Sequence, residues 1–170
     1  LMISSAFTIG VSTLESYTLS MKRQAGTTAS IALNRPTDEQ YKQIQDLDYV
    51  KHAGIDIRVG TAAQKDDSGQ TSKISMDYID QREFEHHIKP TISGIKGDYP
   101  QKVDEIMLSD SALKILGIKT PKIGMNINLT FRSDDGEHRD TFRLSGHFRS
   151  YDNFNRSGAA YVSKELTEQM

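Results

Sequence analysis

Two alternating segments near the C-terminus constrain the fold of this chain most strongly. Every second residue from Met125 to Phe131 is apolar, and a similar alternation returns from Phe142 to Phe148. A period of two is that of a β-strand with one buried face. The polar stretch SDDGEHRD between the segments is typical of a turn. The segments therefore predict an antiparallel hairpin with one apolar face.

Shorter alternating or apolar runs predict further strands. They lie at residues 29–33, 55–59, 74–78, 105–108 and 159–162. A polar stretch from Gln64 to Lys73 separates the second of these from the third and is expected to be a loop. The stretch from Gly94 to Pro100 is rich in turn residues, so it is expected to join two subdomains.

Capping residues mark four helix starts. Each is a Ser, Thr or Asp placed directly before a segment with an apolar face: Thr37, with Gln40 completing a capping box, Asp80, Ser109 and Ser163. Pro90 is expected to stop the second of these helices and Gly117 the third. The last helix is expected to run from Lys164 to Met170. The chain is therefore predicted to be α+β.

Composition narrows the class of protein. The chain has 170 residues, a net charge of −2 and no cysteine. This length suits one domain with a small insert. The charge balance argues against a nucleic-acid binder, because phosphate neutralisation needs an excess of lysine and arginine. The absence of cysteine excludes disulfide scaffolds and cysteine-ligated zinc or iron–sulfur sites.

The N-terminal segment carries no charge before Glu15. No basic residue precedes Lys22, so it is not a signal peptide, and serines and threonines interrupt it too often for a spanning helix. Its apolar residues recur every four or three positions, which predicts one face of a helix ending at Gly26. The stripe comprises Ile3, Phe7, Gly10, Leu14, Tyr17 and Met21.

Two interpretations of this helix stay open. It could be an amphipathic helix packed on its own domain, or it could be a helix that leaves a membrane and pairs through its stripe. The first residue, Leu1, favours the second interpretation, because an excised segment need not begin with Met. The expected pairing seam consists of Ile3, Phe7, Leu14, Tyr17 and Met21.

Motifs of catalysis are missing from the sequence. It has no P-loop, no nucleophile elbow and no His-Glu-x-x-His motif. We therefore predict no catalytic, cofactor-binding or metal-binding residues. Glu83 and His87 share a helix face and form the best metal candidate, with His86 and Glu85 beside them. Two ligands on one face are too few for a closed site, so an ordinary surface is expected there.

The polar face of the hairpin is a candidate for binding an anion. It carries Arg132, Arg143, His147 and Arg149, which could meet an anionic lipid or a peptide carboxylate. Acidic residues of the same hairpin are expected to neutralise much of this face: Asp134, Asp135, Glu137 and Asp140.

The segment from Gly97 to Phe131 (GDYPQKVDEIMLSDSALKILGIKTPKIGMNINLTF) resembles a pattern in the extracytoplasmic domains of FtsX-like and MacB-like ABC transporter permeases. The matching residues are Gly97, Tyr99, Pro100, Glu105, Ile106, Leu108, Ser109, Leu116, Gly117, Gly124, Ile127 and Leu129. The next strand adds Phe142, Leu144 and Gly146. The order and spacing of these residues carry the resemblance.

The resemblance implies a fold and a division of the chain. It implies a membrane-proximal stalk helix at 1–25, a porter-like α/β sandwich portion at 26–96 that continues in 151–170, and a small β-rich, Sabre-like insert at 97–150. A complete domain of this kind returns through a further strand and helix. The chain stops at Met170, so either its return half is missing or it belongs to a reduced subfamily.

The resemblance also implies a function. The domain would lie on the extracytoplasmic side of a bacterial cell membrane and transmit ATPase-driven motion in export or signalling, without being an enzyme or needing a cofactor. Implied partners are a cytosolic ATPase acting through the membrane helices, a second permease copy or paired permease, and an extracellular peptide, lipoprotein or sensor protein. Nucleic acid is not expected. Two alternatives remain: a stand-alone membrane-anchored binding or adhesion module, and a soluble hydrolase with a dispersed site near His86 and His87.

Overall fold

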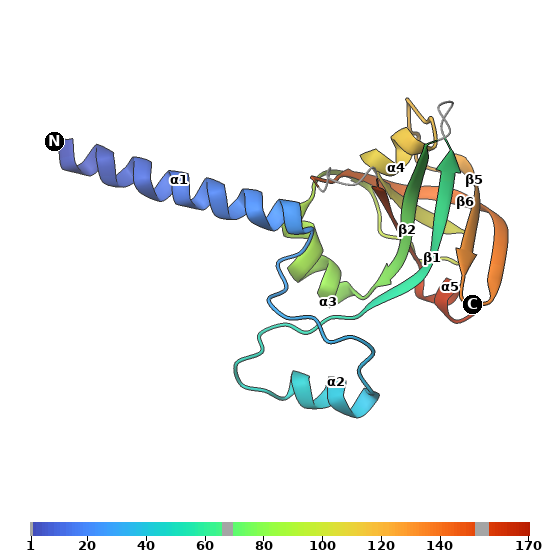
Figure 1. Ribbon diagram of the computed structural model, residues 1–170, viewed down its shortest axis with the longest axis horizontal. Helices are drawn as coiled ribbons and strands as arrows, with labels where there is room; N and C mark the ends of the chain where they lie inside the picture. The colour runs from blue at the N-terminus through green and yellow to red at the C-terminus, as the bar shows by residue number, and fades with distance from the viewer. Residues whose placement is uncertain (1, 66–69, 152–156) are drawn as a thin grey trace.

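The structure is a computed structural model that describes residues 2–65, 70–151 and 157–170, with side chains from residue 13 onward. It consists of a curved sheet with short helices around it and one long helix, α1 (Met2–Ala25), that projects away from this body (Figure 1). The chain is thus mixed α and β, as predicted. Within the described residues, no helix combines the length and the apolar character needed to cross a membrane.

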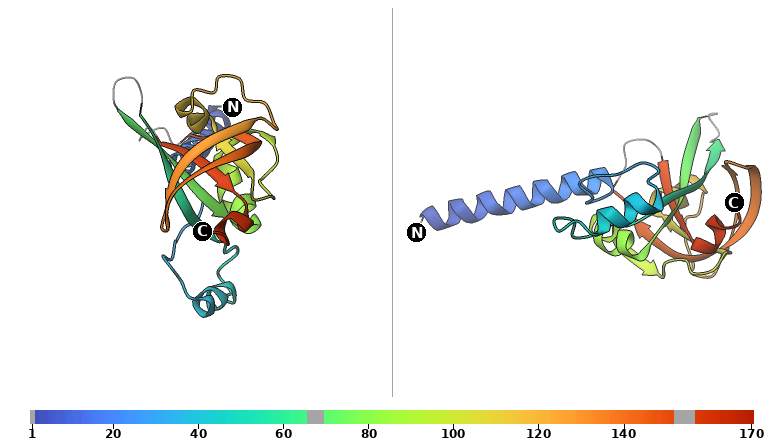
Figure 2. Two further views of the ribbon diagram at one scale, coloured as in Figure 1. Left: turned by 90° about the vertical axis from the view of Figure 1, so that its right-hand side faces the viewer. Right: turned by 90° about the horizontal axis from the view of Figure 1, so that it is seen from below.

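The described strands form one sheet that closes on itself. They are β1 (Asp56–Lys65), β2 (Thr71–Ile79), β3 (Ser93–Gly97), β4 (Glu105–Ser109), β5 (Asn126–Ser133), β6 (Gly136–Arg149) and β7 (Ser157–Val162). Their order is β3-β6-β4-β7-β2-β1-β5, and β5 also pairs with β6. The pairs β2–β7 and β4–β6 are parallel, and the other pairs are antiparallel. Figure 2 shows the strands wrapping around the core.

This closure corrects the expected α/β sandwich. β4, from the predicted insert, pairs with β7, and β5 pairs with β1, so strands of both predicted portions share a single barrel. A sandwich would need helices covering an open sheet. Here the apolar faces of the strands cover one another across the barrel interior. A second cluster lies on the other face of the sheet, where Phe84 and Ile88 of the helical segment 81–91 pack against Met107, Phe148 and Tyr161.

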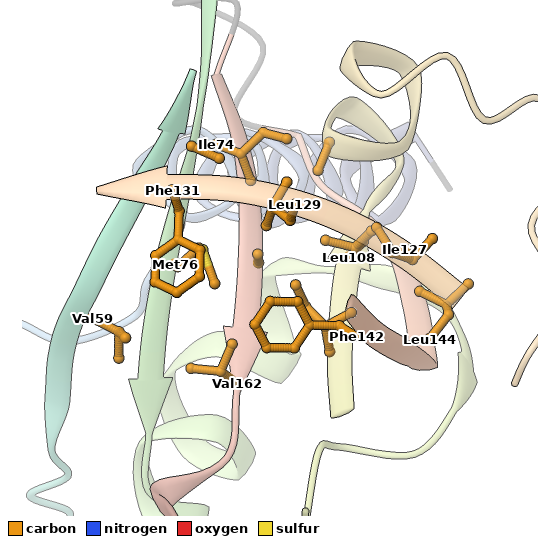
Figure 3. Close-up of a cluster of buried hydrophobic side chains, with 14 of the residues drawn as sticks. Val59, Ile74, Met76, Leu108, Ile127, Leu129, Phe131, Phe142, Leu144 and Val162 are labelled. Carbon is orange, nitrogen blue, oxygen red and sulfur yellow. The ribbon is translucent and has the colours of Figure 1, made fainter. Parts of the chain in front are cut away.

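The hairpin is confirmed. β5 and β6 pair without interruption from Asn126 opposite Arg143 to Ser133 opposite Gly136. The apolar side chains of both strands are buried and the intervening ones are mostly exposed. Inside the barrel, Phe131 and Phe142 meet side chains from β1, β2, β4 and β7 (Figure 3).

The short helices begin where the capping residues predicted. They are α2 (Asp38–Gln45), α3 (Gln81–Glu83), which continues as a π turn (Phe84–Ile88) and a 3₁₀ turn (Lys89–Thr91), α4 (Asp110–Ile115) and α5 (Lys164–Thr167). The capping box of Thr37 and Gln40 is formed, and the side chains of Asp80 and Ser109 cap α3 and α4. α5 is shorter than expected, and the side chain of Ser163 makes no capping bond.

Two local predictions were wrong. Residues 29–33 form no strand, and Ile31 is 87% exposed, because this segment has no neighbouring strand to pair with. The stretch 94–100, which was expected to connect two subdomains, instead contains most of β3, and β3 pairs with the end of β6. Gly97 makes this possible, since its φ is 75° and a Cβ there would lie 2.2 Å from the carbonyl oxygen of Ser145.

Candidate functional site

The attachment of α1 to the body is the first candidate site. α1 ends at Gly26, whose amide donates to the carbonyl of Lys22 at 3.0 Å and whose φ of 74° turns the chain out of the helix. The guanidinium of Arg23 stacks on the ring of Tyr151, 4.3 Å from the ring centroid. The Tyr151 hydroxyl in turn lies 2.8 Å from the hydroxyl of Ser93 on β3.

Two threonines complete the attachment. The almost fully buried Thr91 hydroxyl shares its proton between the carbonyls of Ile88, at 2.7 Å, and Gly26, at 3.1 Å. The amide and hydroxyl of Thr28 donate to the carbonyls of His87 and His86, at 3.0 and 2.9 Å. We call this set the joint: Arg23, Gly26, Thr28, Thr91 and Tyr151. The C-terminal end of α1 is thus held to the body by two segments, one at residues 86–91 and the other at Tyr151.

The predicted seam lies on the free length of α1. Leu14, Tyr17 and Met21 are 66%, 64% and 50% exposed, so these side chains do not pack against the body of their own chain. The side chains of Ile3 and Phe7 lie outside the described residues. α1 projects away from the body in Figure 1 and in the right-hand view of Figure 2, so the described part of its apolar stripe is available to another molecule.

The four predicted anion-binding residues do not form one cluster. Arg132 lies opposite Glu137 on β6. Glu137 is six residues from Arg143 along this strand, so Arg132 and Arg143 are roughly 20 Å apart. Arg143 is ion-paired with Glu105, whose pKa is lowered by hydrogen bonds from the amides of residues 101 and 102 and by Arg143 itself. Only His147 and Arg149 come together, at the end of β6.

His147 and Arg149 line a groove of about 810 Å³ between β3, α4 and residues 117–121. We call it the basic groove. Its charged side chains are Lys96, Lys114, Lys119, Arg149 and Asp110, and its apolar floor includes Leu113, Ile118 and Phe148. Sequence reasoning missed the three lysines. The signal that could have found two of them is the stretch from Lys114 to Lys122, which holds three lysines and no acid.

The turn after α4 places these lysines. The amide of Ile118 donates to the carbonyl of Leu113 at 2.9 Å, and the amide of Gly117 donates to that of Lys114 at 3.1 Å. These two bonds and the φ of 71° at Gly117 form a Schellman motif, which reverses the chain. Lys119 is thereby brought back beside the same groove as Lys114.

The basic groove is poorly neutralised from within. Among the described residues, no ion pair involves Lys96, Lys114 or Lys119, and Arg149 reaches Asp110 only at 4.0 Å. Desolvation and the charge of Lys96 lower the pKa of His147, so this ring is neutral at neutral pH. Four cations and one carboxylate leave a net charge of +3 on a chain whose total is −2.

The histidines near α3 form a stack. The rings of His52 and His86 are parallel with centroids 3.6 Å apart, and His87 lies edge-on to His52 at 6.4 Å. Desolvation raises the pKa of Glu83, the other predicted ligand, and His87 partly opposes this shift. Within the described part of the chain, no group of three or more His, Cys, Asp or Glu residues is arranged to hold a metal ion.

Several residues that carry the permease resemblance have structural roles. The Tyr99 hydroxyl donates to the carbonyl of Ile79 at 3.0 Å and accepts from its amide at 3.1 Å, which fixes the end of β2. Gly97 and Gly146 are cross-strand partners, and a Cβ on Gly146 would lie 2.8 Å from the carbonyl oxygen of Asp98. These three residues of the pattern therefore hold strands of the sheet in place.

Comparisons with known proteins give one likeness to report. No family model and no curated protein matches this chain. Among solved structures, it is similar to the extracellular domain of the noncanonical ABC-type transporter YknZ from Gram-positive bacteria, with 11% identity and a TM-score of 0.46. The match covers 79% of this chain and 65% of that domain. A TM-score below 0.5 does not establish a common fold, so function must be argued from this chain's own residues.

Proposed function

We propose that this chain is an extracytoplasmic domain of a bacterial ABC transporter permease and that it transmits motion without catalysing a reaction. The observation that carries the proposal is the geometry of α1. The described part of its apolar stripe, at Leu14, Tyr17 and Met21, is exposed, while its C-terminal end is fastened to the body by the joint. The permease pattern from Gly97 to Phe131 supports the same reading.

In this proposal α1 is the stalk between the membrane helices and the body. A cytosolic ATPase would drive the membrane helices, and α1 would carry the displacement outward to a peptide, lipoprotein or sensor protein. Packed elements transmit displacement as rigid bodies. The body would correspond to the porter-like portion and the Sabre-like insert merged into one barrel, and the seam of α1 would face a second permease copy.

The joint decides whether a moving helix moves the body. A helix that swivels freely at Gly26 would dissipate its motion in the turn, because glycine there has no side chain to restrain it. Arg23 and Thr91 prevent this by fixing the last turn of α1 and the carbonyl of Gly26. Loosening the joint should therefore uncouple ATP hydrolysis from transport.

The test weakens the joint by mutation, then restores it with a disulfide, and measures ATP hydrolysis and transport in the full transporter with its ATPase. Arg23→Ala with Thr91→Val is expected to leave ATP hydrolysis intact and to lower transport by about two- to thirtyfold, the range of mutational effects on coupling. Adding Thr28→Cys and His87→Cys should restore transport. The two residues are in contact through a backbone hydrogen bond of 3.0 Å and a side-chain contact of 3.2 Å, and no native cysteine competes. Formation of the disulfide is checked by thiol titration before transport is measured.

The matched control places the disulfide where nothing is expected to move. Asn128 and Thr141 are cross-strand partners on the exposed face of the hairpin, with a side-chain hydrogen bond of 2.8 Å. Asn128→Cys with Thr141→Cys should not rescue the loosened joint. Transport that stays coupled in the loosened variant would contradict the proposal, as would rescue that persists after reduction. A gene that encodes no further spanning helices would favour a stand-alone anchored module instead.

A further inference from the structure

The basic groove lies beside β3, which is an edge strand of the described sheet. β3 pairs with β6 on one side, and no strand among residues 2–65, 70–151 and 157–170 pairs with its other side. Ser93, Gly94 and Lys96 of this strand line the groove. We propose that the basic groove is a docking surface for an acidic, extended segment of a partner protein.

Charge is the first argument for this occupant. The groove carries a net +3 on a chain of net charge −2, so it attracts anions that the rest of the surface repels. Lys96, Lys114 and Lys119 are exposed and have no ion pair with described residues. The single carboxylate, on Asp110, already accepts bonds from the amides of Ser111 and Ser150 at 2.9 and 3.1 Å.

Shape is the second argument. A volume of about 810 Å³ exceeds what one small anion would fill. Its floor is apolar at Leu113, Ile118 and Phe148, so an occupant with alternating acidic and apolar side chains could meet both the floor and the cations. An exposed strand at the border of a groove favours an extended segment, because an added strand satisfies the free backbone groups.

The groove is also connected to the joint. Ser93 lines the groove and lies in hydrogen-bonding contact with Tyr151, and Tyr151 holds Arg23 at the end of α1. A segment docked on β3 therefore sits two side chains from the helix. The inference deepens the proposed function, because it names the chemistry of the partner that would receive the motion, but the binding surface itself does not involve α1.

The test measures binding of a defined peptide to the full chain. The probe is a fluorescein-labelled octapeptide of alternating Glu and Val, followed by fluorescence anisotropy. We expect saturable binding that weakens at high salt and is absent for the same peptide with Gln in place of Glu. Lys114→Glu with Lys119→Glu should weaken it by roughly ten- to thirtyfold, since two exposed attractions become repulsions.

The matched control makes the same charge change elsewhere. Lys42→Glu with Lys73→Glu alters exposed lysines of α2 and β2, outside the groove, and should leave binding within about twofold. Lys114→Gln with Lys119→Gln is a gentler variant in case the reversal disturbs folding, which circular dichroism would show. It should still weaken binding severalfold.

Two results would overturn the inference. One is peptide binding that is absent or equally strong in the groove and control variants. The other is lysine-dependent binding to phosphatidylglycerol vesicles without peptide binding, which would assign the groove to lipid headgroups. Because the peptide assay uses the isolated chain and the joint assay uses the full transporter, loss of transmission and loss of docking are separately visible.

Discussion

At the scale of single residues, the pair of Arg58 and Asp77 shows how a charge is kept inside the barrel wall. Asp77 is 7% exposed, whereas the side chain of Arg58 is 62% exposed and pairs with it. Burial raises the pKa of Asp77, and the charge and hydrogen bond of Arg58 lower it, with burial the larger effect. The folded chain thus binds this proton more tightly than the unfolded chain, so this carboxyl favours folding less as pH rises.

We expect Arg58→Ala to lower the free energy of unfolding by about 2 kcal/mol at pH 7.5, less than a fully buried pair because Arg58 is exposed. Without Arg58 the pKa of Asp77 rises further, so the loss should shrink as pH falls toward 4.5 and the carboxyl is protonated. Urea unfolding at both pH values checks this, with Arg139→Ala on the exposed hairpin as control. An equal loss at both pH values would contradict it.

At the scale of elements, the histidine stack ties the segment between α1 and β1 to the π turn. His52, His86 and His87 meet there, and Gly54 packs against Glu83. Desolvation, then the charges of His86, His87, Lys51 and Arg82, lower the pKa of His52. The folded chain therefore binds a proton at His52 less tightly than the unfolded chain, so stability is lost as pH falls below the ordinary pKa of a histidine ring.

Acidification should loosen this segment before the barrel unfolds. The protection factors of the α2 amides, which compare the observed exchange rate with the intrinsic rate at the same pH, are expected to fall between pH 7 and pH 5, while those of β2 and β7 stay high. His52→Gln removes the repulsion between charged rings and should flatten this pH dependence. A pH dependence that is unchanged in His52→Gln would assign the effect to other groups.

The stripe of α1 makes a separate prediction about association. Most of a helix's stability comes from packing of its apolar face, so the exposed apolar face of α1 should find a partner in solution. Leu14→Asp with Tyr17→Asp is expected to abolish concentration-dependent association in sedimentation experiments without changing the unfolding of the barrel. Ser16→Asp with Leu19→Asp adds the same charge off the seam and should preserve association. Equal loss in both pairs would contradict pairing through the seam.

Elements with strong local signals could be predicted from the sequence. The β5–β6 hairpin, α2 and α4 were predicted because alternation or a cap specifies each of them within a few residues. β3 could not be found, because its sequence SGIKG has neither alternation nor β-branched content beyond Ile95, and only pairing with β6 makes it a strand. Of the basic groove, the sequence predicted His147 and Arg149 but not the lysines. Lys96 could not be predicted, because it meets His147 only through the pairing of β3 with β6.

At the scale of the whole molecule, closure of the barrel depends on a short contact. β1 and β5 pair only at Thr61 opposite Arg132 and Ala62 opposite Phe131. The neighbouring Gly60 lets the strands approach, because a Cβ there would lie 2.8 Å from the carbonyl oxygen of Arg132. This closure could not be predicted from the sequence, since nothing local distinguishes an open sheet from a closed one.

Gly60→Val should therefore separate β1 from β5 at this contact. We expect a loss of about 2 kcal/mol in unfolding free energy, typical of overpacking, and faster amide exchange at Thr61 and Ala62. Ala63→Val enlarges an exposed position of the same strand and should be nearly neutral. A Gly60→Val variant as stable as the parent chain would show that β1 and β5 can separate without cost.

The place of β7 in the sheet has a consequence for the order of folding during synthesis. β7 is the last strand in the sequence, yet it lies between β4 and β2 and pairs with β2 across more than eighty residues, as Ile74 with Gly158. Until the ribosome has made it, β2 and β4 have no neighbour on their inner edges. A nascent chain of this protein therefore cannot close its sheet, and leaves the edges of β2 and β4 unpaired, until β7 has emerged.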